Sequence, residues 1–135
     1  MVILIADAAW MAYRYTRQDS WKNVDVLLVG VKKYSLDLSE YLHPTRLSAH
    51  NFQLTQDLCR SYNATGITED IYIPQNIQLM QALRPDLQEI AVIGDCQFFG
   101  IYSTLLVKKY LQEYPSDLKF TFLDGRFLST NTLYE

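Results

Sequence analysis

The stretch VILIADAAWMAYR, residues 2–14, decides the fold. It opens with an apolar run containing β-branched residues, which predicts a strand buried on both faces of a parallel sheet. Asp7 ends this run, and the apolar positions between Ala8 and Arg17 then recur with helical spacing. A buried strand that leads through an aspartate into a helix is typical of an α/β protein. Asp7 is either a ligand at the end of a strand or a cap of the following helix.

The same alternation continues along the chain. Further strands are predicted at 24–31, 70–73, 89–95 and 118–123, helices at 48–62, 75–83 and 98–114, and a short helix or turn at 35–42. Strands that alternate with helices indicate right-handed crossovers onto a mostly parallel sheet. We therefore expect one α/β domain over residues 1–135, a Rossmann-like three-layer sandwich with a mostly parallel sheet of about five strands.

Composition narrows the class of protein. The chain has 135 residues, of which 49% are hydrophobic, and a formal net charge of −3. It is too apolar for a disordered chain, contains no membrane-spanning run, and has no strong charge that would attract nucleic acid or a membrane surface. Only the six-residue apolar run MVILIA precedes Asp7, with no basic start, so we expect no signal peptide, no membrane partner and a cytoplasmic location.

Carboxylates follow three of the predicted strands. Asp7 and Asp95 lie at carboxyl ends, where open parallel sheets bind their ligands. If their strands are neighbours, the two carboxylates converge and need a cation between them, for which Mg²⁺ or Mn²⁺ is suited. Asp124 follows the last predicted strand and is a third candidate ligand, or part of an Asp-Gly turn. Each aspartate could instead have only a structural role.

Glu69 and Asp70 are weaker candidates. They come before the predicted strand at 70–73, which places them at its amino end. We therefore expect these two acids to lie away from the ligand-binding edge of the sheet.

Three segments resemble PIN-like nucleases. The stretch LIADAAWMAYR (4–14) resembles the first strand and helix of the flap-endonuclease branch, and the stretch EIAVIGDCQFFGIYSTL (89–105) is similar to a later motif of the NYN branch. LKFTFLDGRFLSTNTL (118–133) is similar to the end of that branch, a strand followed by a serine and a leucine. The matching residues in the first two segments are Leu4, Ile5, Asp7, Ala12, Tyr13, Arg14, Gly94, Asp95 and Phe98.

The resemblance implies a metal-dependent nuclease that acts on RNA or DNA phosphodiesters. Asp7 and Asp95 would be the catalytic metal ligands, and Arg14 would face a substrate phosphate. Arg17 lies three residues after Arg14, so both arginines share one helix face. They could reach one phosphate, or instead only pair with Asp19 or Glu40.

The chain also departs from this family. Ala8 stands where glycine, threonine or asparagine is usual, Gln97 replaces a second aspartate, and the predicted helix at 75–83 carries no acid. The pattern therefore fits either an active nuclease or a degenerate relative that does not cleave.

A second class of function is a non-enzymatic assembly or regulatory protein. Such a protein would be a small subunit of a larger complex, for example a phage structural or accessory protein. Its partner would be another protein or a second copy of this chain, bound through an aromatic interface. The candidate interface residues are Trp10, Tyr13, Tyr15, Trp21, Tyr34, Tyr41 and Tyr72.

Overall fold

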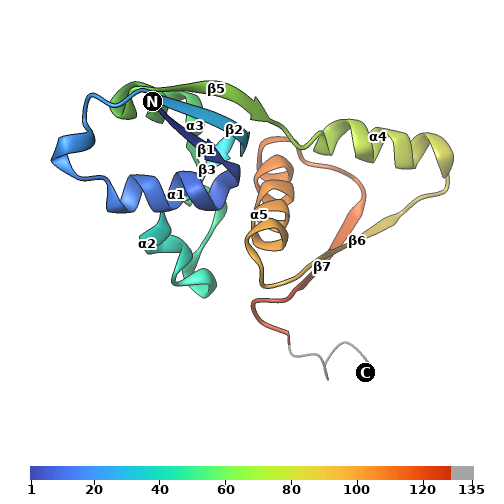
Figure 1. The fold of residues 1–135 in the computed structure, drawn as a ribbon. Helices are drawn as coiled ribbons and strands as arrows, with labels where there is room; N and C mark the ends of the chain where they lie inside the picture. The colour runs from blue at the N-terminus through green and yellow to red at the C-terminus, as the bar shows by residue number, and fades with distance from the viewer. Residues whose placement is uncertain (129–135) are drawn as a thin grey trace. The chain divides into compact units, whose positions relative to one another are not determined.

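The computed structural model describes residues 1–128 and has an α/β architecture (Figure 1). The chain forms two compact units. The first contains Met1–His43 and His50–Asp70, and the second contains Pro44–Ala49 and the chain from Ile71 onward. The strands of residues 1–128 form one three-stranded and two two-stranded sheets, where the sequence predicted about five strands in one sheet. The α/β class is confirmed, and a single domain stays a prediction.

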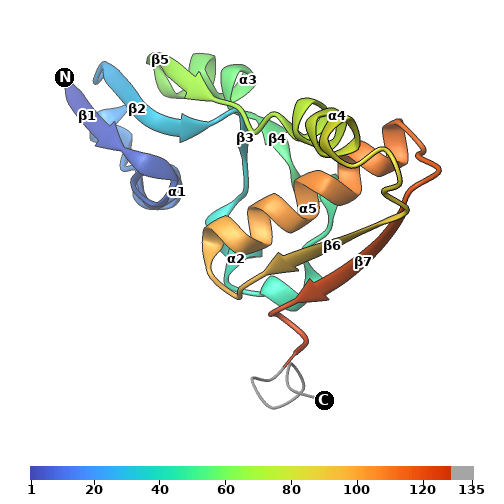
Figure 2. The ribbon, with the colours of Figure 1, turned by 90° about the vertical axis from the view of Figure 1, so that its right-hand side faces the viewer.

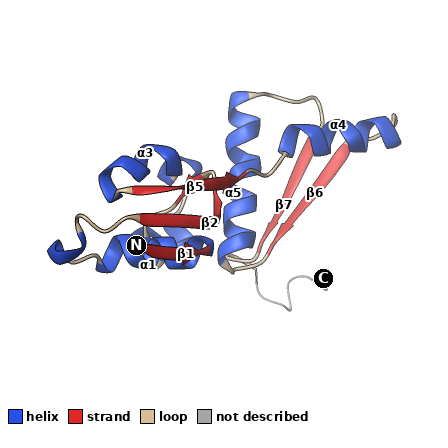
Figure 3. Cartoon of the chain, turned by 45° about the horizontal axis from the view of Figure 1, so that its top comes forward, coloured by secondary structure: helices blue, strands red, loops and turns tan. Residues whose placement is uncertain are grey.

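The larger sheet of the first unit is parallel, as predicted. It contains β1 (Val2–Ile5), β2 (Val26–Lys32) and β5 (Ala64–Glu69) in the order β1-β2-β5 (Figure 3). The prediction of the third strand at 70–73 is wrong, because this strand ends at Glu69. Asn63, with φ 48°, ends the preceding helical turn and lets the strand begin one residue later.

Helix α1 (Ala6–Thr16) packs against the sheet and builds the core of the first unit. Its aromatic side chains Trp10 and Tyr13 are buried against Val26 and Leu28 of β2. An α-helix turns by about 100° per residue, so residues three or four positions apart lie on one face. The two aromatic residues have this spacing. The predicted helix is therefore confirmed.

The region predicted as one helix at 48–62 is divided. It contains short 3₁₀ turns at Ala49–Asn51 and Arg60–Tyr62, strand β4 (Gln53–Leu54) and helix α3 (Thr55–Cys59). β4 pairs antiparallel with β3 (Tyr34–Ser35), which explains the interruption, because tertiary pairing overrides a weak helical pattern. The remaining short helical elements are η1 (Asp19–Trp21), α2 (Leu38–Tyr41) and η2 (Pro44–Arg46).

The second unit contains α4 (Ile73–Leu83), β6 (Glu89–Gly94), α5 (Phe98–Glu113) and β7 (Lys119–Asp124), close to the predicted positions. β6 and β7 are parallel, and α5 packs along them (Figure 2). Gly94 permits this close packing, because a Cβ there would lie 2.2 Å from Thr104 Oγ1. No helix within residues 1–128 is long and apolar enough to cross a membrane.

Candidate functional site

Titratable side chains gather at the carboxyl ends of the three parallel strands in the first unit. Asp7 follows β1, Lys32 ends β2 and Glu69 ends β5 (Figure 3). Because parallel strands end at the same edge of a sheet, the three residues lie on one edge. This is the edge at which open α/β sheets bind their ligands.

Asp7 is a buried carboxyl rather than a simple helix cap. Its side chain is 8% exposed, and its Oδ1 accepts a hydrogen bond of 2.8 Å from the backbone amide of Lys32. The residue at the N-cap of α1 is Ile5, and no side chain caps this helix. Burial raises the pKa of Asp7, while the amide and the ammonium of Lys32 act in the opposite direction. A perturbed carboxyl group at such an edge is typical of a functional site.

The backbone immediately before Asp7 is strained. Ala6 has φ 67°, a left-handed conformation that residues with a Cβ rarely adopt. The strain turns the chain from β1 directly into α1, which sets the direction of the Asp7 side chain. Strained residues of this kind cluster at functional sites, where the surrounding structure compensates for them.

Glu69 belongs to this edge, contrary to the sequence prediction. The true strand ends at Glu69, so Glu69 and Asp70 lie at its carboxyl end. The ammonium of Lys32 pairs with Glu69 Oε2, and Lys33 Nζ lies 2.8 Å from Asp70 Oδ2. The negative charge of Glu69 also contributes to the raised pKa of Asp7. The β-branched residues in ATGITE (64–69) were the sequence signal that would have located this strand.

Asp95 lies in the second unit, directly after β6. Its Oδ1 accepts a hydrogen bond of 3.0 Å from the backbone amide of Gln97, which forms a local turn. Gly100 of α5 packs against this turn, because a Cβ at Gly100 would lie 2.1 Å from Asp95 Oδ1. Asp95 therefore has the strand-end position that the sequence predicted, together with a structural role in the turn that leads into α5.

Asp124 ends β7 in the same unit and is held by Arg126. The guanidinium donates Nε–H to Oδ1 at 2.9 Å and Nη2–H to Oδ2 at 2.6 Å, and Lys108 Nζ lies 3.6 Å from Oδ2. These hydrogen bonds from Arg126 lower the pKa of Asp124. Both oxygens of Asp124 accept hydrogen bonds from Arg126, and this pairing already balances the charge that a metal ion would need.

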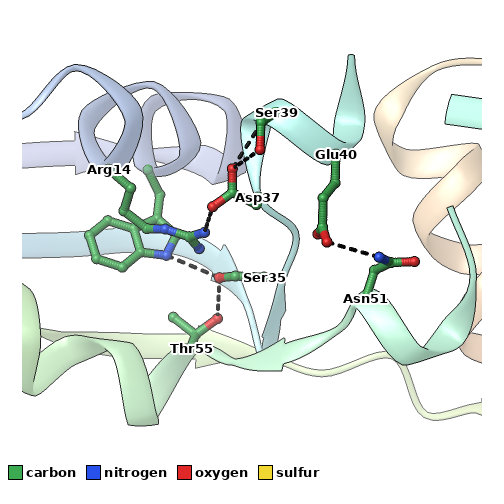
Figure 4. Close-up of polar contacts among 8 residues, drawn as sticks. Arg14, Ser35, Asp37, Ser39, Glu40, Asn51 and Thr55 are labelled. Atoms are coloured by element: carbon green, nitrogen blue, oxygen red, sulfur yellow. Dashed lines mark hydrogen bonds and ion pairs between the residues drawn. The ribbon is translucent and has the colours of Figure 1, made fainter. Parts of the chain in front are cut away.

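Arg14 and Arg17 lie toward the other end of α1 from Asp7. Ten residues of helical rise separate Asp7 from Arg17, which corresponds to about 15 Å. Arg14 Nη2 lies 3.3 Å from Asp37 Oδ2 (Figure 4), and the Arg14 guanidinium lies over the Trp10 ring. Arg17 donates hydrogen bonds to main-chain carbonyl oxygens of Ser61 and Lys22. The two arginines therefore do not lie beside Asp7, with which the sequence prediction placed them in one site.

Within residues 1–128, no three or more histidine, cysteine, aspartate or glutamate side chains form a group that could hold a metal ion. The segment from 129 to 133, which completes the third family-like segment, lies outside the described residues. Comparison with protein-family models, with curated proteins and with solved structures finds no match for this chain.

Proposed function

We propose that the edge formed by Asp7, Lys32 and Glu69 binds a divalent cation together with a phosphodiester, and that the chain acts as a nuclease-like domain on RNA or DNA. The observation that carries this proposal is the buried Asp7 carboxyl, which follows a strained residue at the carboxyl end of a parallel strand. Neither burial nor strain is needed merely to begin a helix. Together they are typical of a carboxyl group positioned for a ligand.

The residues present fit one kind of cation. Asp7 and Glu69 offer two carboxylates at one edge, and Lys32 now pairs with Glu69. Mg²⁺ is commonly held by one or two carboxylates, with water and substrate phosphate completing its coordination, and Mn²⁺ prefers the same hard ligands. Such an ion would stabilise charge on a phosphate and lower the pKa of a bound water.

The chain's own residues would orient this site. The Lys32 amide donates a hydrogen bond to Asp7 Oδ1, so Asp7 Oδ2 is the oxygen that would bind the cation. The ammonium of Lys32 adds a positive charge at the same edge and favours an anionic substrate. With these two acids alone, the chain would be a weak nuclease or a degenerate relative that binds without cleaving.

The single five-stranded sheet expected from the sequence is part of this proposal. Within residues 1–128, β1 has one hydrogen-bonded neighbour, β2, and β6 has one, β7. Open edges of apolar strands are templates for further pairing. A single mostly parallel sheet of about five strands would give both strands a second neighbour. Amide hydrogen exchange tests it: slow exchange along both β1 and β6 supports one sheet, and fast exchange at their outer amides contradicts it.

A thermal-shift titration with MnCl₂ tests the proposed cation site. A cation that binds only the folded protein, at about 100 times its dissociation constant, adds about 2.7 kcal/mol, which is several degrees in Tm. We expect this shift in the wild type and its loss in Asp7→Asn and Glu69→Gln. Glu113→Gln, which changes a half-exposed acid on α5, is the matched control and should keep the shift. No shift in the wild type, or an equal shift in all four proteins, would contradict the site.

A protein-binding role is the second candidate, and a specific surface favours it. Trp10 and Tyr13 are buried, so they are not available for the aromatic interface that the sequence predicted. The face of the sheet opposite α1 instead carries the aligned row Ile5, Val29 and Ile67, which are 68%, 44% and 86% exposed. Exposed apolar patches often mark interfaces. If Ile67→Lys converts an oligomer into a monomer in sedimentation, this role is supported, and a monomeric wild type would argue against self-association.

A further inference from the structure

A pocket of about 480 Å³ lies at the end of α1 away from Asp7, entirely within the first unit. Its lining comes from the end of α1, from η1 and from the turn before β5. The residues that matter to its chemistry are Arg14, Arg17, Asp19, Lys22, Ser61 and Tyr62. Lys22 and Tyr62 lie shortly before the starts of β2 and β5. The pocket therefore belongs to the amino-terminal edge of the sheet and is separate from the proposed cation site.

Positive charge dominates this pocket. Three cationic side chains line it, and the one lining carboxylate, Asp19, is 92% exposed and pairs with Lys22 at 2.8 Å. Arg14 has its carboxylate partner, Asp37, outside the lining. Arg17 pairs with no carboxylate among residues 1–128, because its hydrogen bonds go to two neutral carbonyl oxygens. Within the described part of the chain, Arg17 thus has no ion-pair partner of its own, although Asp19 lines the same pocket.

Two of the guanidinium nitrogens also lack acceptors. Arg14 Nη1 and Arg17 Nε are buried and have no hydrogen-bond partner among residues 1–128. The Arg14 side chain is only 5% exposed, so its charge is largely removed from water. Tyr62 fixes Arg17 from one side, with its ring 5.0 Å from the guanidinium carbon. Planar guanidinium groups held in this way match the geometry of phosphate oxygens.

We propose that this pocket binds a phosphate group. The guanidinium groups of Arg14 and Arg17 supply donors in a partly desolvated setting, and the exposed ammonium of Lys22 adds a third positive charge to the lining. Binding requires a small shift of Arg17, which exchanges a carbonyl acceptor for a phosphate oxygen. The phosphate belongs either to a free phosphorylated small molecule or to a nucleic-acid backbone, and these sources share the same chemistry at the pocket.

Binding is measured on the full chain by ¹H–¹⁵N NMR of the arginine Nε–H groups during titration at constant ionic strength. The probes are inorganic phosphate, adenosine monophosphate and a short single-stranded DNA, each compared with sodium chloride. We expect saturable shifts at Arg14 and Arg17 with phosphate probes and none with chloride. Tighter binding of the monophosphate than of DNA would indicate a small molecule, and the reverse would indicate a backbone.

Variants make the assignment specific. Lys22→Gln changes a side chain that is 65% exposed and should weaken phosphate binding about fivefold, the upper range for one exposed charge contact. Arg17→Gln should abolish saturation, and Arg84→Gln, on a 70% exposed side chain outside the pocket, should leave binding unchanged. Asp7→Asn should also retain phosphate binding, which separates this site from the proposed cation site. Equal shifts with chloride, or equal effects of Lys22→Gln and Arg84→Gln, would overturn the proposal.

Discussion

The backbone amide of Lys32 donates a 2.8 Å hydrogen bond to Oδ1 of Asp7, which ties the end of β2 to the first turn of α1. This bond joins two elements that are 25 residues apart in the sequence. It also gives a buried carboxyl group a fixed direction at the carboxyl end of the sheet. The stability of the first unit and the properties of the candidate site therefore depend on the same residue.

Asp7 makes the first unit less stable as the pH rises. Burial raises the pKa of Asp7 above the ordinary value of 3.8, so the folded protein binds this proton more tightly than the unfolded chain. The contribution of Asp7 to stability is thus fully present below pH 3.8 and is lost as the pH rises through the folded pKa. We expect Asp7→Asn to have a higher Tm than the wild type at pH 7, with the difference vanishing toward pH 4.

The control for that measurement is Asp7→Ala. Asparagine keeps an oxygen that can accept the Lys32 amide, whereas alanine leaves this amide without its acceptor. An unsatisfied buried donor costs about 1–3 kcal/mol, so Asp7→Ala should lower the Tm at every pH. If Asp7→Asn is destabilising at pH 7, the raised pKa does not govern the stability of this site.

Ala6→Gly, which relieves the backbone strain at this residue, should affect the stability of the fold and the binding of Mn²⁺ differently. Glycine adopts φ 67° without the clash that a Cβ causes, which is worth about 1 kcal/mol before the greater flexibility of the unfolded chain is subtracted. We expect Ala6→Gly to leave the free energy of unfolding unchanged or to raise it slightly, as measured in urea. If the strain positions Asp7 for a cation, the same variant should show a smaller Mn²⁺-induced shift. Strong destabilisation by Ala6→Gly would contradict the role assigned to this residue.

A buried hydrogen-bond chain fixes Trp10 in the core of the first unit. Trp10 Nε1–H donates to Ser35 Oγ at 3.0 Å, and Ser35 Oγ lies 2.7 Å from Thr55 Oγ1 (Figure 4). Thr55 Oγ1 in turn donates to the Lys32 carbonyl oxygen. Ser35→Ala should therefore cost about 1–3 kcal/mol and alter tryptophan fluorescence, because the indole loses its acceptor. Ser39→Ala, on an exposed residue of α2, is the matched serine control and should leave the fluorescence unchanged.

The pair Asp124–Arg126 should dominate the acid stability of the second unit. Hydrogen bonds from Arg126 lower the pKa of Asp124, so the stability from this pair is present above pH 3.8 and is lost as the pH falls through the folded pKa. The two side chains are 7% and 2% exposed, and breaking such a buried pair costs about 3–5 kcal/mol. We expect Arg126→Met to lose this amount in urea unfolding at pH 7. Arg84→Met, which removes an exposed ion pair, should produce no measurable change.

The predictable part of this fold came from strong local signals. The apolar run before Asp7, the helix that follows it and the elements between Ile73 and Asp124 are close to their predicted positions. The strand β5 was misplaced, because the sequence predicted a strand at 70–73 and the structure has it at Ala64–Glu69. In the structure, Gly66 lies inside the strand, where a Cβ would come within 2.3 Å of the Leu28 carbonyl oxygen. This close approach depends on which strands pair, so the local sequence pattern does not reveal it.

The candidate site was only partly predictable for the same reason. Asp7 was identified from its place at the end of an apolar run. Glu69 was assigned to the wrong end because its strand was misplaced, and the partner of Arg14 was not identified, because Asp37 is 23 residues away. The role of Arg126 was also missed, since its carbonyl partners are far away in the sequence. Local periodicity identifies elements, whereas the contacts that define a site depend on how those elements pack.

The long-range hydrogen bonds of Arg126 affect the order in which the parts of the chain fold. Its Nη1–H groups donate to the carbonyl oxygens of Pro44 and Leu47, across 82 and 79 residues. Contacts of such long range form slowly, because a large loop must close before they contribute. During synthesis, the segment Pro44–Ala49 is made long before Arg126, so its hydrogen bonds to the guanidinium can form only after Arg126 has been added. We expect the second unit to reach its native state late, after the first unit's local contacts have formed.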